Sequence, residues 1–283
     1  DNTTNLNIRG GSINIGGTDD GNQGDARGRM VGMGATRLSS LNLDGNLYVG
    51  TYSNGYGQII FTNPAQVTDV TVQSYFFVGG DGGVVENTYG EARFALGGGN
   101  FNVMTNQNVN FYVGAGNGGS GDATGILSVT NADQINIGCA INSWGTFAVG
   151  RYGNSTAGDK VTGLVTFTKA NAVNIRLSGF QVGYRDAYGS LVFDNTGAAR
   201  IWGTTMEVGD QEGERRIDHV ALAGDGRGRA RRSAAREGVR GGGRGEHHVL
   251  EQQLPVAVEH AAHEDRLDAL AAGGEHGVGA GQL

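Results

Sequence analysis

Proline, cysteine and charged residues are all scarce in this sequence. It has 2 prolines against 53 glycines, and because the glycines follow no Gly-X-Y period, a collagen-like triple helix is excluded. The single cysteine, Cys139, excludes an intramolecular disulfide. Because it lies in the apolar run INIGCAIN, we expect it to be a buried free thiol.

The lack of charge and of long apolar runs narrows the choice of partner. Only 17% of the residues are charged and the net charge is -7, so there is no basic field to hold nucleic acid or an anionic membrane. No apolar run reaches the roughly 18 residues that a bilayer requires. We therefore predict no nucleic-acid partner and no membrane-spanning segment.

What the chain does contain is a repeat built on Val-Gly. Its glycines recur every 26 to 36 residues, a period typical of solenoids and propellers. The copies are LYVG at 47–50, FFVG at 76–79, FYVG at 111–114, FAVG at 147–150, FQVG at 180–183 and MEVG at 206–209. The outer two of the three residues before each glycine are apolar, as in a strand with one buried face. The first residues of the copies are predicted to form one interior column: Leu47, Phe76, Phe111, Phe147, Phe180 and Met206.

A second strand follows each copy after another glycine, with apolar residues again at alternate positions. These strands read GQIIFTN, GEARFAL, GILSVTN, GLVTFTK and GSLVFDN, and a less regular third strand includes QINIG and AVNIRLSG. Three short strands per repeat without a helical period predict an all-β, right-handed parallel β-solenoid with stacked phenylalanine ladders. The rival is a β-propeller, but its blades of four antiparallel strands normally need about 40 residues or more.

The composition changes near residue 210. No aromatic residue follows Trp202, no asparagine follows Asn195, and all six histidines lie from His219 onward. We predict a solenoid domain over 1–210 and a low-complexity Gly/Ala/Arg/Glu/His tail over 211–283. The tail has three interpretations: an irregular or disordered linker, an arginine-glycine segment that binds nucleic acid, or an out-of-frame translation. Acidic residues offset the arginines, which argues against nucleic-acid binding. We favour an out-of-frame translation, because a changed reading frame produces such an abrupt loss of asparagine and aromatic residues.

Insertions collect between the Val-Gly glycine and the next strand glycine, where 5 to 12 residues intervene. In a solenoid this corner becomes a ridge of loops, and loops on a rigid scaffold commonly carry binding residues. Tyrosines there are suited to stacking on sugars, although each is alternatively a cover for its own loop. The outward stripe of Tyr48, Phe77 and Tyr112 is either exposed or covered. The candidate binding residues are Tyr52, Tyr56, Tyr89, Tyr152, Tyr184, Tyr188, Arg151 and Arg185.

The same ridge also carries acidic and basic residues. Acidic and basic residues together resemble the layout of polysaccharide lyases, which use acids to hold calcium and a base to take a proton. The loops are of unequal length and no doubled acidic pair projects from adjacent strands, so we interpret these charges as solvated. No catalytic residue, metal site or cofactor is predicted. The charges considered are Asp81, Asp159, Asp186, Arg151, Lys160 and Arg185.

The repeat, a hydrophobic residue followed by x-Val-Gly, a loop and Gly-x-Leu-x-Phe, resembles the β-strand repeats of bacterial autotransporter passengers and related secreted surface proteins. The resemblance covers about residues 41 to 210. It implies an exported solenoid that acts as a stalk, adhesin or matrix component at the bacterial cell surface. We therefore expect a non-enzymatic extracellular scaffold that contacts polysaccharides or other cell-surface macromolecules and is open to end-to-end self-association. A solenoid-type polysaccharide lyase or hydrolase is the alternative.

Overall fold

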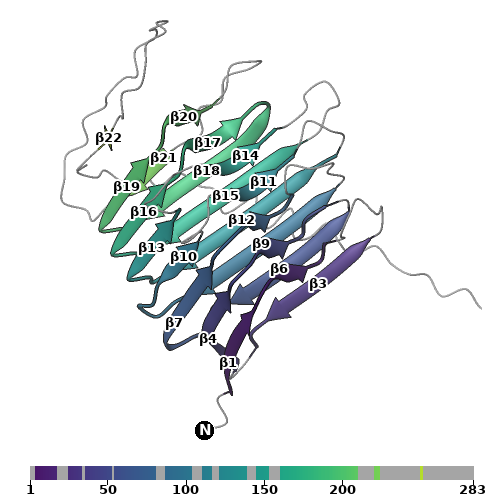
Figure 1. Cartoon of the computed structure of the whole chain (residues 1–283), viewed down its shortest axis with the longest axis vertical. Helices are drawn as coiled ribbons and strands as arrows, with labels where there is room; N and C mark the ends of the chain where they lie inside the picture. The colour runs from purple at the N-terminus through teal and green to yellow at the C-terminus, as the bar shows by residue number, and fades with distance from the viewer. Residues whose placement is uncertain are drawn as a thin grey trace, which may run out of the picture.

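The chain winds into three parallel sheets (Figure 1). The structure is a computed structural model that describes residues 4–17, 25–33, 36–52, 54–80, 87–103, 110–116, 121–138, 145–152, 160–209, 220–223 and 249–250. Sheet A contains β1 (Thr4–Gly10), β4 (Thr36–Leu43), β7 (Pro64–Val72), β10 (Phe101–Val103), β13 (Gln134–Ile137), β16 (Ala172–Arg176), β19 (Ala198–Trp202) and β22 (Val249–Leu250). Sheet B contains β2 (Ile13–Ile15), β5 (Leu47–Val49), β8 (Phe76–Val78), β11 (Phe111–Ala115), β14 (Thr146–Arg151), β17 (Gly179–Tyr184) and β20 (Thr205–Val208). Sheet C contains β3 (Ala26–Val31), β6 (Gly55–Phe61), β9 (Thr88–Ala95), β12 (Ala123–Thr130), β15 (Val161–Thr168), β18 (Ala187–Asp194) and β21 (Val220–Ala223).

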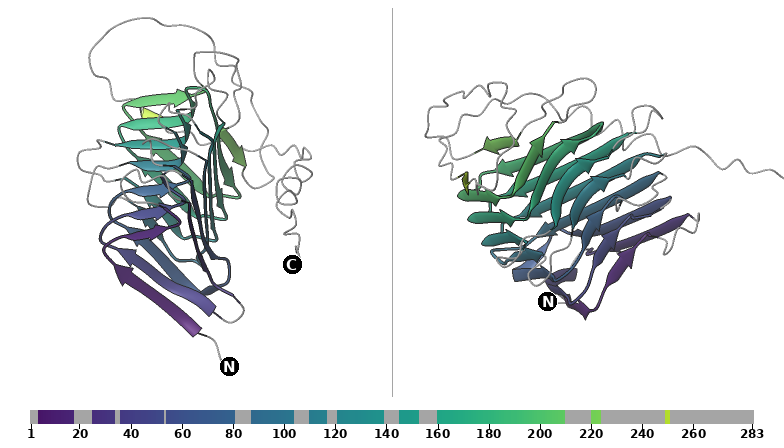
Figure 2. Two further views of the ribbon diagram at one scale, coloured as in Figure 1. Left: turned by 90° about the vertical axis from the view of Figure 1, so that its right-hand side faces the viewer. Right: turned by 45° about the horizontal axis from the view of Figure 1, so that its top comes forward.

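Each coil contributes one strand to each sheet, in the order A, B, C, and every strand pairs with its equivalent in the next coil. The pairs are parallel, as between β12 and β15, and only β22 joins its neighbour β19 in antiparallel fashion. Figure 2 shows this stacking from two further sides. The parallel β-solenoid with three strands per coil is therefore confirmed, and propeller blades of antiparallel strands are excluded.

The predicted phenylalanine ladder lies in the interior of sheet B. The ring centroids of Phe76 and Phe111 are 4.8 Å apart, those of Phe111 and Phe147 are 4.9 Å apart, and those of Phe147 and Phe180 are 5.2 Å apart. The rings are within 10° of parallel, so like side chains stack in register, as the repeat predicts. Aromatic pairs of this kind contribute about 0.5–1.5 kcal/mol each beyond the burial of their area.

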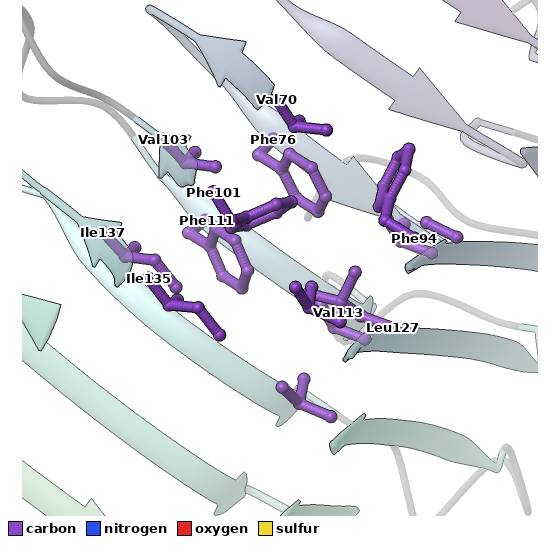
Figure 3. Packing of buried hydrophobic residues seen from close by; sticks show 14 of the residues in the cluster. Val70, Phe76, Phe94, Phe101, Val103, Phe111, Val113, Leu127, Ile135 and Ile137 are labelled. Carbon is purple, nitrogen blue, oxygen red and sulfur yellow. The ribbon is translucent and has the colours of Figure 1, made fainter. Parts of the chain in front are cut away.

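The three sheets meet on this ladder. Phe101 of sheet A packs edge-on against Phe76, with centroids 5.7 Å apart and ring planes at 78°. Phe94 of sheet C lies 6.0 Å from Phe101, and Figure 3 shows these side chains converging in the same interior. The core therefore has no separate layers and is one continuous apolar column.

A pair of glycines closes each coil where sheet B passes into sheet C. A Cβ atom on Gly125 would lie 2.1 Å from the backbone N of Gly114 and 2.2 Å from the O of Val78. Gly114 itself has φ +66°, and a Cβ there would lie 2.0 Å from the O of Thr162. The two backbones are therefore in contact at this corner, where a side chain larger than that of glycine would not fit.

Parts of the prediction fall outside the described residues. Cys139, Asp81 and Asp159 are among them, so their predicted roles are untested. Of residues 211–283, the structure describes only β21, which extends sheet C, and β22. The interpretations of the tail therefore stay predictions. In the described part of the chain, no helix has the length and apolar character needed to span a membrane.

Candidate binding surface

The predicted binding residues fall into two groups, one on strands of sheet C and one at the ends of strands of sheet B and in the turns that follow them. Tyr56, Tyr89 and Tyr188 belong to β6, β9 and β18 of sheet C and not to loops, contrary to the expectation of one loop ridge. These tyrosines occupy equivalent positions on sheet C. In the pairing of successive strands, Thr124 and Thr162 lie between Tyr89 and Tyr188. The remaining candidates gather near sheet B: Tyr52, Arg151, Tyr152, Tyr184 and Arg185.

The stripe of Tyr48, Phe77 and Tyr112 follows the outside of sheet B, and it is largely covered. Phe77 is 6% exposed and Tyr112 is 5% exposed. The ring centroids of these two residues are 4.9 Å apart, and Tyr48 lies 5.5 Å from Phe77. Tyr52 contacts Tyr48 edge-on at 6.2 Å. The sequence left open whether this stripe is exposed or covered, and the structure shows that it is largely covered.

Arg151 links this stripe to the turns beside it. Its guanidinium carbon lies 4.9 Å from the ring centroid of Tyr112 and 4.0 Å from that of Tyr152, within the range of cation–π attraction. Its Nη1 donates a hydrogen bond to the Tyr112 hydroxyl, and its Nη2 donates one to the Tyr152 hydroxyl at 2.8 Å. The buried Nε of Arg151 has no hydrogen-bond partner.

A second guanidinium group lies beside the same tyrosine. The guanidinium carbon of Arg185 is 5.2 Å from the ring centroids of both Tyr152 and Tyr184. Those two rings contact each other edge-on at 5.4 Å. We call Arg151, Tyr152, Tyr184 and Arg185 the arginine–tyrosine cluster; in it, two positive charges flank one aromatic ring.

The backbone of this cluster is held in a conformation that its residues rarely adopt. Tyr152 has φ 58° and Arg185 has φ 51°, in the left-handed region that costs an L residue about 1–2 kcal/mol. The backbone N of Tyr152 nevertheless donates to the O of Tyr184 at 2.9 Å, so coil stacking continues through the turn. The same left-handed conformation recurs in turns of other coils, for example at Tyr52 and Asn131, so it belongs to the solenoid turns in general.

Electrostatics keep the Tyr112 hydroxyl neutral. Burial raises the pKa of Tyr112, an effect that the nearby positive charge of Arg151 opposes only in part. The hydroxyl therefore stays protonated at neutral pH, and it accepts the hydrogen bond from Arg151 as a neutral group. The charge of Arg151 is not neutralised by this contact.

A different cluster lies on the outside of sheet C. Tyr56 and Tyr89 stack at 5.0 Å with planes 13° apart. Beside them Glu91, which is 5% exposed, accepts hydrogen bonds from Gln58 Nε2 at 2.6 Å and from the Tyr89 hydroxyl at 3.1 Å. Arg93 completes an ion pair with the other carboxylate oxygen. Burial, and then the charge of Glu91, raise the pKa of Tyr89.

Sequence reasoning missed Glu91 as a structured site, although Gln58 and Glu91 occupy equivalent repeat positions. Three donors already engage this carboxylate, which leaves it poorly suited to accept a proton from a substrate. Glycoside hydrolysis commonly uses two carboxyl groups about 5–10 Å apart. No second carboxylate takes part in this hydrogen-bond network among the residues described.

An asparagine ladder on the outside of sheet A was also missed. Asn136 Nδ2 donates to Asn102 Oδ1 at 2.9 Å, and Asn174 Nδ2 donates to Asn136 Oδ1 at 3.0 Å. The signal was available in the similar triplets FNV, INI and VNI, which place asparagine between two buried residues. Each amide satisfies the next, so the ladder strengthens the stacking of coils.

Of the remaining charges considered, Asp81 and Asp159 lie outside the described residues, and Asp186 follows Arg185 with φ 56°. The backbone N of Lys160, just before β15, donates to Oδ1 of Asp122, just before β12, at 2.8 Å, so this carboxylate links two successive coils. Over the ranges that the structure describes, no group of three His, Cys, Asp or Glu side chains is placed to hold a metal ion. Comparisons of the chain with protein-family models, curated proteins and solved structures yield no match.

Proposed function

We propose that this protein is a non-enzymatic extracellular scaffold of adhesin type at a bacterial cell surface, whose sheet-B surface binds glycans. The observation that carries the proposal is the unbroken series of ring and guanidinium contacts from Tyr52 to Arg185. These contacts join β5, β8, β11, β14 and β17, which are successive strands of one sheet. The series therefore follows the long direction of the coil stack.

Such a surface has the chemistry that sugars require. The apolar faces of tyrosine rings pack against sugar rings, and hydroxyl and guanidinium groups bond to sugar hydroxyls. Because the side chains are anchored on stacked strands and packed turns, binding orders few groups that were previously free. Phe77 and Tyr112 are covered, so the side chains that a sugar can reach lie toward the two ends of the series. These are Tyr48 and Tyr52 at one end and the arginine–tyrosine cluster at the other.

A glycan array probed with the full chain tests the proposal. We expect retention of at least one polysaccharide and no release of unsaturated or shortened product from it. Tyr152→Ala should weaken this retention, because it removes the ring that both arginines contact. The control Val67→Ser changes a side chain that is 54% exposed on sheet A and should leave retention as it is.

Two results would overturn the proposal. Cleavage of a retained polyuronate would establish the lyase or hydrolase alternative. Failure to retain any glycan, in a protein whose circular dichroism spectrum shows folded β-structure, would remove the glycan-binding function.

A further inference from the structure

We propose that the arginine–tyrosine cluster selects carboxylated sugars, so that the glycan bound by this surface is a polyuronate. This inference rests on the proposed function and adds the class of sugar. It places the carboxylate of a uronate on Arg151 and Arg185, and the sugar ring against Tyr152 and Tyr184.

Arg151 has N–H donors that its contacts within the protein do not use. A guanidinium group has five N–H donors, and the hydrogen bonds to the hydroxyls of Tyr112 and Tyr152 use two of them. Nε is buried and has no partner, so it lies out of reach of a ligand at the surface. Nη1 and Nη2 each carry a second N–H that neither of these hydrogen bonds uses, and these are the donors that acceptor oxygens of a ligand would engage.

The arginine–tyrosine cluster carries positive charge. Within the described residues the hydrogen bonds of Arg151 go to two neutral hydroxyls, so none of them supplies a compensating negative charge. Arg185 brings a second positive charge to the same Tyr152 ring. Asp186 follows Arg185 in the chain, so the anion is assigned first to Arg151, with Arg185 as a further positive group beside Tyr152.

The shape of the group favours a carboxylate. A guanidinium group is planar and its paired N–H donors match the two oxygens of a carboxylate, which gives a directional contact. The edge-on arrangement of Tyr152 and Tyr184 at 5.4 Å supplies aromatic area directly beside the charges. A simple inorganic anion would use the charges alone, whereas a uronate uses both the charges and the rings.

The experiment compares four immobilised polymers: polygalacturonate, its full methyl ester, dextran sulfate and neutral dextran. We expect the full chain to bind polygalacturonate at least about tenfold more tightly than the methyl ester, because charged hydrogen bonds are worth about 1.5–3 kcal/mol. Arg151→Gln and Arg185→Gln should each reduce the binding of polygalacturonate. Arg29→Gln, which removes the same charge from an exposed position on β3, should reduce it much less.

Arg151→Lys separates geometry from charge. Lysine keeps the positive charge and loses the planar fork, so we expect it to bind polygalacturonate more weakly than the unchanged protein. Arg185→Gln serves as the second variant if Arg151 substitutions lower the melting temperature, since Arg185 is exposed.

The outcomes distinguish this inference from the function on which it rests. Equal binding of polygalacturonate and its methyl ester would overturn carboxylate selection and leave glycan binding standing. Equal binding of dextran sulfate and polygalacturonate would also overturn it, in favour of attraction to any polyanion. Binding of none of the four polymers, together with an empty glycan array, would remove the proposed function itself.

Discussion

Glycine at the corner between sheets B and C serves a close approach of two backbones. At Gly163 an added Cβ would lie 2.1 Å from the O of Val113 and 2.2 Å from the N of Gly150. Both atoms are backbone, so neither can rotate away as a side chain would. The glycine count of this chain therefore reflects a narrow interior corner as well as its turns.

Gly163→Ala is expected to destabilise the protein by about 2–3 kcal/mol, because an overpacked site must displace two coils at once. Urea unfolding followed by circular dichroism measures this change. Gly11→Ala is the matched control, since nothing lies within 4 Å of a Cβ at Gly11. Equal stability of the two variants would show that the corner tolerates a methyl group.

Tyr89 leads to a prediction about alkaline pH. Its pKa is raised by burial and by Glu91, so the folded state keeps this proton at a pH where the unfolded chain has lost it. Stability is then fully present below the unfolded value of about 10 and falls as the pH rises above it.

The free energy of unfolding, measured by urea titration from pH 8 to 11, should therefore decline above pH 10. Tyr89→Phe should be less stable than the unchanged protein at pH 8, since Glu91 loses a donor, but should show a shallower decline. A decline of the same steepness in both proteins would assign it to other groups.

At the scale of a strand and its turn, sheet C ends in the same way in successive coils. The residues that follow it, Asn131, Lys169 and Asn195, have φ values of 56°, 55° and 51°. Asparagine tolerates this left-handed conformation better than most residues. Lys169 is the member of this set whose side chain is least suited to it.

Lys169→Asn is expected to stabilise the protein by several tenths of a kcal/mol to about 1 kcal/mol. The backbone bond from Lys169 N to Asp194 O, at 2.9 Å, is independent of the side chain and should persist. A rise in melting temperature measures the effect. Lys169→Ala lacks the advantage of asparagine, and a similar rise in that variant would contradict this explanation.

The strands could be predicted from the sequence because the alternation of apolar residues within a strand and the repeat from coil to coil identify the same inward residues. Alternation within a strand identifies inward residues, and repetition between coils puts like residues in register, so Phe76, Phe111 and Phe147 stack as expected. The division of the tyrosines between two faces could not be predicted. Side-chain direction after Gly150 depends on the left-handed turn at Tyr152, and the alternation of a strand does not extend through such a turn.

The burial of the stripe of Tyr48, Phe77 and Tyr112 could not be predicted from the alternation of residues within a strand either. Phe77 occupies an outward position, and alternation alone would place it in solvent. Its burial comes from neighbours such as Tyr75, 5.3 Å away, and from the stacked Tyr112. The candidate site was therefore found residue by residue, while its assembly around Arg151 required the fold.

At the scale of the whole molecule, the stability of each coil depends on its contacts with the coils on either side. In a stack of this kind a coil contacts the one before it and the one after it, so the free energy approximates a sum over adjacent pairs. Phe111 lies between Phe76 and Phe147 and is fully buried. Met206 pairs with Phe180 in the same column but is 37% exposed.

Phe111→Ala should therefore cost about 3–5 kcal/mol, as a buried phenylalanine commonly does, while Met206→Ala should cost much less. Urea unfolding of the two variants gives the comparison. Hydrogen exchange adds a test of position: in Phe111→Ala the amides of β8, β11 and β14 should exchange faster, whereas Met206→Ala should accelerate exchange only near β17 and β20. A coil that is coupled only to its neighbours should pass the loss of stability no further than those neighbours. Faster exchange of amides throughout all three sheets in Met206→Ala would instead show that the solenoid unfolds as one cooperative unit.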